Sequence, residues 1–219
     1  MTDLAAALLR LSDAFPDDPG PAHDPFEIKD RFDIFVWHGP YVFVDDFDMP
    51  AQMRIWAPRI LRLLTSGELT YTRVIAPRFA QCGWPGWPPH RRTAVEDVLR
   101  AWWAATLSTH PSPIPVTGVL TVVSQLSGGV EPWLATWSAV GGVAAARHLG
   151  DLLHDYLPWS SFVDDFDQEA AQDAIRAWLL RDGVDLLLAL PPGEAQDSAL
   201  AELAELEDKG LWWLPHQWW

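Results

Sequence analysis

The sequence predicts an all-α protein, a single domain of about nine stacked antiparallel helices arranged as a short α-solenoid. Three observations support this fold class. Apolar residues recur with helical spacing in most segments. Short Pro- and Gly-rich breaks separate those segments, as in arrays of helical hairpins. Apolar residues make up 49% of the chain, which is enough for a substantial core.

The central element is the stretch from Gly83 to Leu107. Its Pro- and Gly-rich start permits sharp bends but no helix interior. One stripe of apolar side chains then follows at i, i+3, i+4, i+7 and i+11, which predicts a long core helix. The stripe consists of Val95, Val98, Leu99, Trp102 and Thr106. We expect Trp84 and Trp87 to fold back over the first turns of this helix.

The remaining helices are expected on either side of this element. Their approximate ranges are 3–14, 49–64, 70–81, 116–126, 132–140, 143–156, 167–181 and 194–209. A short apolar piece, 184–190, is expected as a separate element. Aromatic and β-branched residues predict one short extended segment near 32–45. Residues 1–31 are expected to hold a helix and a mobile Pro-rich loop, and residues 211–219 form a Trp-rich tail.

Composition suggests a compartment and an origin. Cys82 is the single cysteine, which fits a reducing environment, and we expect it to be a small buried residue at a helix end. The N-terminus lacks the pattern of a signal peptide, and no run reaches the ~20 apolar residues of a membrane span. We therefore expect a cytoplasmic protein. Arginine outnumbers lysine 13 to 2, which suggests a GC-rich bacterial genome.

Charge is spread unevenly along the chain. The net charge is −15, yet residues 49–100 carry 8 bases and only 3 acids. Residues 1–48 carry 11 acids and residues 151–219 carry 15. A chain this acidic repels phosphates at long range, which argues against nucleic acid or an anionic membrane as partner. It favours a basic protein partner.

The basic stretch is rich in arginine. Seven of its eight arginines make up the basic region considered as a candidate site: Arg54, Arg59, Arg62, Arg73, Arg78, Arg91 and Arg92. Two interpretations stay open: the arginines face the acidic ends of the chain itself, or some of them dock a carboxylate- or phosphate-bearing partner. The tail residues Trp218 and Trp219 are likewise either packed onto the core or exposed as an aromatic anchor for a partner.

The pentapeptide VDDFD occurs twice, each time before an expected helix. Its aspartates are Asp45, Asp46, Asp48, Asp164, Asp165 and Asp167. Clustered aspartates are candidate ligands for a hard cation. We interpret Asp48 and Asp167 instead as helix N-caps, with the other aspartates favourable near the positive helix ends, and expect no metal there.

A second cluster lies in the predicted helix 143–156. His148, Asp151 and Asp155 share one face at i, i+3 and i+7, a set that can bind a transition metal. His154 points away from His148, so we expect this face to be a solvated surface instead. None of the common nucleotide-binding, hydrolase or zinc motifs is present. We therefore expect no cofactor and lean against an enzyme.

The segment Trp84–Pro89 and the helix after it resemble a group of bacterial all-helical, HEAT-like proteins, in which a WPxWPP-like break precedes a Trp-rich helix. The resemblance covers about residues 45–110 and implies a stacked-helix fold but no activity. Our leading hypothesis is a non-catalytic interaction module, for example an inhibitor or immunity protein for a basic partner. The alternative is an enzyme or small-molecule binder whose Trp- and Arg-lined pocket takes an anionic ligand.

Overall fold

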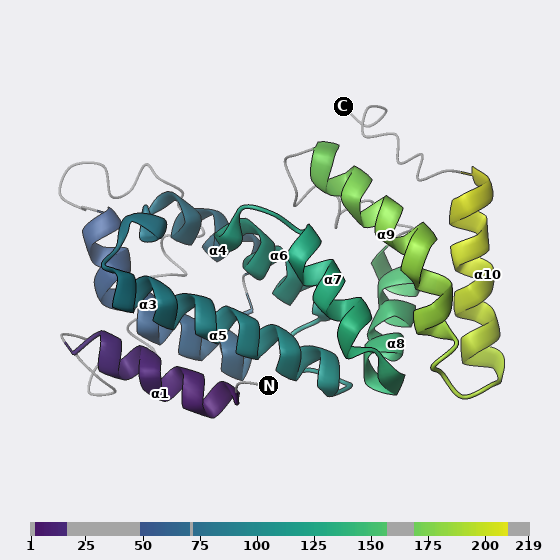
Figure 1. Cartoon of the computed structure of the whole chain (residues 1–219), viewed down its shortest axis with the longest axis horizontal. Coiled ribbons are helices and arrows are strands. Elements are labelled where there is room, and N and C mark those ends of the chain that lie inside the picture. The colour runs from purple at the N-terminus through teal and green to yellow at the C-terminus, as the bar shows by residue number, and fades with distance from the viewer. Residues whose placement is uncertain (1–2, 17–48, 71, 157–168, 210–219) are drawn as a thin grey trace. The chain divides into compact units, whose positions relative to one another are not determined.

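The computed structural model describes residues 3–16, 49–70, 72–156 and 169–209 (Figure 1). Within these ranges all regular structure is helical and no strand occurs, so the all-α prediction is confirmed. The expected extended segment near 32–45 lies outside the described residues. Both VDDFD segments and the tail 211–219 also lie outside them.

Nine α-helices lie within the described ranges. They are α1 (Leu4–Ala14), α3 (Met49–Ser66), α4 (Thr72–Gln81), α5 (Pro89–Ser108), α6 (Val116–Ser127), α7 (Glu131–Val140), α8 (Gly142–Asp151), α9 (Glu169–Leu187) and α10 (Glu194–Lys209). Two short elements complete the set: a 3₁₀ turn, η3 (Trp84–Gly86), and a π-helical turn, η4 (Leu152–Tyr156). The predicted helices are therefore found, with ends shifted by a few residues.

The chain divides into two compact units, Met1–Trp102 and Trp103–Trp219, and the boundary falls within α5. The expectation of a single domain over 1–219 stays a prediction. We call them unit 1 and unit 2.

In unit 1 the aromatic break before α5 is part of the core. Trp87 packs against Phe79 of α4 at 6.0 Å between ring centroids and against Phe15 at 5.7 Å. Trp84 is buried as well. The predicted apolar stripe of α5 is confirmed, since its members are between 0% and 4% exposed. Cys82 is buried at the end of α4, as expected, and burial raises the pKa of its thiol.

Unit 2 is organised around α9, which packs against α7, α8 and α10 (Figure 1). Its inward residues Ile175, Trp178 and Leu179 are at most 3% exposed, as predicted. Because α9 contacts three helices, including the non-consecutive α7, the regular stacking of a solenoid is not confirmed.

A chain of tryptophans forms the core of unit 2. Trp137 packs edge-on against Trp103 at 5.4 Å and, with its ring tilted by 40°, against Trp178 at 5.0 Å. The indole N–H of Trp103 donates to the carbonyl oxygen of Trp133, and that of Trp137 donates to the carbonyl oxygen of Ala145. The indole N–H of Trp178 donates to the Ser138 hydroxyl. Each large ring is thus buried without losing its hydrogen bond.

One helix end predicted from the sequence was wrong. The apolar piece 184–190 is not a separate element, because α9 continues through Gly183 to Leu187. A Cβ atom at Gly183 would lie 2.9 Å from Cδ2 of Leu203 in α10. A side chain at position 183 would therefore require the Leu203 side chain to move.

Candidate functional site

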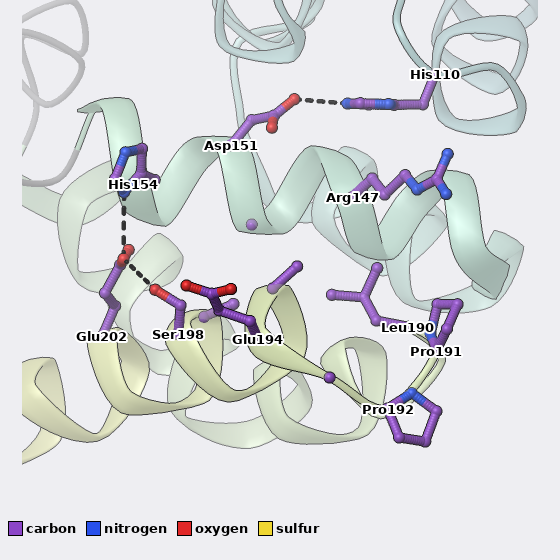
Figure 2. Close-up of a pocket in the computed structure, with 14 residues that line it drawn as sticks. His110, Arg147, Asp151, His154, Leu190, Pro191, Pro192, Glu194, Ser198 and Glu202 are labelled. Atoms are coloured by element: carbon purple, nitrogen blue, oxygen red, sulfur yellow. Dashed lines mark hydrogen bonds and ion pairs between the residues drawn. The ribbon is translucent and has the colours of Figure 1, made fainter.

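A groove of about 480 Å³ lies in unit 2 (Figure 2). One side is formed by α8 and η4, the other by α10 and the connection that leads into it. We use the word floor for the small and apolar lining residues, which are Gly150, Leu190, Pro191, Pro192, Ala195 and Ala199. The groove therefore offers apolar contact area along its base.

Carboxylates dominate the rim of the groove. Asp151 projects from α8, whereas Glu194 and Glu202 project from α10 (Figure 2). Glu202 interacts with His154 at 3.3 Å and accepts a hydrogen bond from Ser198. Arg147 is the single arginine among the lining residues. With neutral histidines, three negative charges face one positive charge, so the rim is net acidic.

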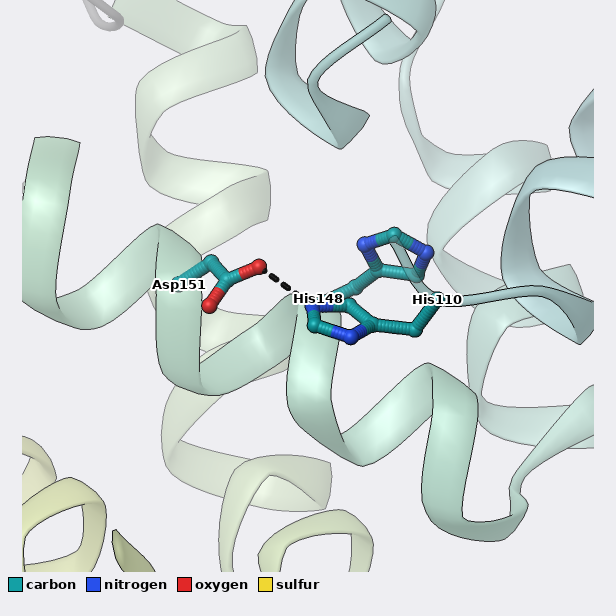
Figure 3. A group of neighbouring side chains, drawn as sticks. All are labelled: His110, His148 and Asp151. Carbon is teal, nitrogen blue, oxygen red and sulfur yellow. Dashed lines mark hydrogen bonds and ion pairs between the residues drawn. The ribbon is translucent and has the colours of Figure 1, made fainter. Parts of the chain in front are cut away.

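At one edge of the groove, two histidines and a carboxylate meet (Figure 3). We call His110, His148 and Asp151 the histidine cluster. His110 follows the end of α5, and the other two lie one turn apart on α8. His110 Nε2 lies 2.7 Å from Asp151 Oδ2, and the two imidazole centroids are 4.7 Å apart. One nitrogen or oxygen atom of each residue lies within 4.8 Å of those of the other two.

The expectation of a solvated face around His148 was wrong. His148 is only 3% exposed, because its ring inserts against the end of α5. Its Nε2 lies 2.9 Å from the carbonyl oxygens of both Thr106 and Thr109. Carbonyls only accept hydrogen bonds, so Nε2 carries the proton and donates to both. The Thr106 carbonyl also accepts a 3.2 Å bond from the Thr109 N–H, so His148 adds a further contact that ties the end of α5 to α8.

The remaining ring nitrogen of His148 keeps its lone pair. Desolvation lowers the pKa of His148 below its ordinary value of 6.5, and the neighbouring His110 acts in the same direction. The hydrogen bonds to Thr109 and Thr106 oppose this shift but are outweighed. The ring is therefore neutral at pH 7, with Nδ1 available as an acceptor or metal ligand.

The predicted arginines lie in unit 1. Arg59 is 8% exposed, whereas Arg54 is exposed. Arg62 donates a 2.6 Å hydrogen bond to Ser12 of α1, and the Arg91 guanidinium lies 4.9 Å from the centroid of Phe15. Arg92 pairs with Glu96 at 3.8 Å. Arg62 thus contacts α1 itself, and Arg91 contacts Phe15, the residue that follows α1.

Several predicted site residues fall outside the described ranges. These are Trp218, Trp219, Asp45, Asp46, Asp48, Asp164, Asp165 and Asp167. The side chains of Arg73, Arg78 and Asp155 are likewise outside the description. Their predicted roles as anchors, caps or charges stay predictions.

No sequence pattern predicted that His110 would join this cluster. It lies 38 positions before His148 in a turn, with no spacing that links it to α8. Only the packing of the α5 end against α8 brings the two rings together.

The chain matches no family model, no curated protein and no solved structure. The resemblance to bacterial helical proteins therefore stays a prediction. Among the helices of the described ranges, none is both long and apolar enough to pass through a bilayer.

Proposed function

We propose that the protein is a non-catalytic binding module whose groove in unit 2 takes a basic segment of a protein partner. The observation that supports this is the combination of an apolar floor with an acidic rim in the groove. Arginine and lysine have the matching chemistry, because an aliphatic stem covers apolar surface while the charged end reaches a carboxylate.

Glu194 is the residue best placed to receive such a charge. It is exposed in the first turn of α10 and lies beside the apolar residues of the floor (Figure 2). Within the described ranges no ion pair of Glu194 is found. The net charge of −15 adds a long-range attraction that speeds the encounter with a basic partner.

The groove does not suit the alternative ligand class, an anionic small molecule. Its lining contains one arginine, three carboxylates and no tryptophan. An anion would therefore meet net repulsion at the rim. Inhibition of, or immunity against, a basic toxin is one concrete form of the proposed role. We also place this role in the cytoplasm, because a single cysteine fits a reducing compartment.

A charge-reversal experiment tests the groove directly. We would measure fluorescence anisotropy of a labelled peptide that alternates Arg with Leu, and of a matched peptide with Glu in place of Arg. Ala195→Arg places a positive charge on the groove floor, and Ala135→Arg makes the same change on an exposed site of α7 outside the groove.

The Arg peptide is expected to bind, and its affinity should fall as salt is added. Its binding should be lost with Ala195→Arg but not with Ala135→Arg. Glu194→Gln should weaken binding by up to about 5-fold, the scale of one exposed ion pair. Equal binding of the Arg and Glu peptides would overturn the proposal. So would equal effects of the two arginine substitutions.

A further inference from the structure

We infer that the histidine cluster is a binding site for a divalent transition metal, with Zn²⁺ as the ion it fits best. His110, His148 and Asp151 bring two imidazoles and one carboxylate to a single point. Two histidines and one carboxylate, with a further position open to water, make up a common ligand set for zinc. The inference does not depend on the proposed binding of a basic partner.

The arrangement of His148 is the first argument. Its Nε2–H is held by two backbone carbonyl oxygens, each at 2.9 Å. A histidine that ligates a metal usually donates its other ring N–H to a carbonyl or carboxylate, which fixes the ring and the tautomer. His148 has this second contact already in place, and its Nδ1 is left as the nitrogen that can bind the ion.

The contact between His110 and Asp151 is the second argument. Their 2.7 Å separation is that of a hydrogen bond, whose proton a metal ion would replace. Ligands 2.0–2.2 Å from a tetrahedral zinc lie about 3–4 Å from one another. The separations between the three ligand atoms, which are at most 4.8 Å, must therefore shorten when the metal binds. Side-chain rotation can do this, because the His110 and Asp151 side chains are 19% and 52% exposed.

The position of the cluster supplies an entry path. His110 and Asp151 line the groove, whereas His148 closes the site from the buried side. An ion could therefore reach the cluster from the groove and retain water on that side. His154 also lines the groove, but its Nδ1 pairs with Glu202 and it is not a member of the cluster. This makes His154 a matched control.

The test is titration of the chelator-treated full chain with Zn²⁺ by calorimetry, and with Co²⁺ by visible absorption. One equivalent is expected to bind. His110→Ala and Asp151→Asn should each lower the affinity by more than the ~10–100-fold typical of losing an outer partner of a metal ligand. His154→Ala should leave the affinity unchanged, which separates the cluster from other histidines.

His148→Gln provides a third variant that keeps a donor toward the two carbonyls. If it fails to fold, as judged by circular dichroism, the two partly exposed positions still decide the question. The inference is overturned if neither Zn²⁺ nor Co²⁺ binds the wild-type chain. It is equally overturned if binding survives both His110→Ala and Asp151→Asn.

Discussion

His148 shows how one side chain can serve both the fold and a site. One ring nitrogen fastens the end of α5 to α8, and the other faces His110 and Asp151. Sequence spacing placed His148 and Asp151 together on one face correctly, but it suggested a solvated face. The burial of that face depends on the α5 end, which no local pattern in 143–156 reveals.

Buried His148 should make stability depend on pH. Its pKa is lowered by burial, so the unfolded chain binds more protons than the folded chain below pH 6.5. The contribution of neutral His148 to the free energy of unfolding should be complete above that pH. It should decrease as the pH falls toward the folded-state pKa. We expect urea unfolding in metal-free buffer to show this loss as the pH falls below 6.5.

His148→Gln should remove that part of the pH dependence while His110 and Asp151 remain. An identical slope in the variant and the wild type would show that His148 does not cause it.

At the scale of elements, α7 and α9 are joined by one hydroxyl. Ser138 of α7 accepts a 2.8 Å hydrogen bond from Trp178 and donates a 2.6 Å bond to Asp182, both on α9. Hydrogen bonds from Arg181 and Ser138 hold the pKa of Asp182 below its ordinary range. The packing of α9 on α7 is thus combined with a polar contact that fixes its register.

Ser138→Ala should therefore be costly. It would leave the indole N–H of Trp178, a residue only 1% exposed, without its partner. The expected loss in the free energy of unfolding is about 1–3 kcal/mol, measured by chemical denaturation. Ser108→Ala is the control, because Ser108 is exposed and its hydroxyl bonds only Ala104, so its effect should stay within about 0.5 kcal/mol. Equal losses in the two variants would show that the hydrogen bonds of the Ser138 hydroxyl make no special contribution.

The close approach of α9 and α10 at Gly183 gives a second prediction at this scale. Gly183→Leu would force a side chain into the space of Leu203 and should destabilise the protein by about 1–3 kcal/mol. Gly150→Ala is the matched helical control, because its nearest atom, Cβ of Ala199, lies at 3.9 Å. That change should raise stability by up to about 1 kcal/mol. Melting curves of both variants and the wild type test these expectations. A Gly183→Leu variant more stable than the wild type would contradict the first of them.

At the scale of the molecule, much of the fold could be predicted from the sequence. Helical periodicity and Pro or Gly breaks located α5, α6 and α10 closely, because these signals act over one or two turns. The continuation of α9 to Leu187 was missed, since glycine normally weakens a helix and Gly183 therefore favours a break. The groove and the histidine cluster could not be predicted, because segments far apart in the sequence form them.

The two proposals, taken together, predict coupling between metal and partner. A divalent ion at the cluster adds positive charge to the edge of the acidic groove. Zn²⁺ should therefore weaken binding of the Arg–Leu peptide, by about 5-fold or more if the coupling reaches typical values. Anisotropy titrations with and without Zn²⁺ measure this. In Asp151→Asn the effect of Zn²⁺ should disappear, and an undiminished effect in that variant would place the ion elsewhere.

The tryptophan chain in unit 2 has an optical consequence. Trp137 stands at 81° to Trp103 and at 40° to Trp178, with ring centres 5.0–5.4 Å from its own. Non-parallel chromophores at such separations share their excitations, which produces paired circular dichroism bands of opposite sign. These bands depend on the rings keeping their mutual angles, so they should vanish as the core of unit 2 loosens, even while its helices persist. Unit 2 therefore contains an internal spectroscopic probe of its own packing, with no added label.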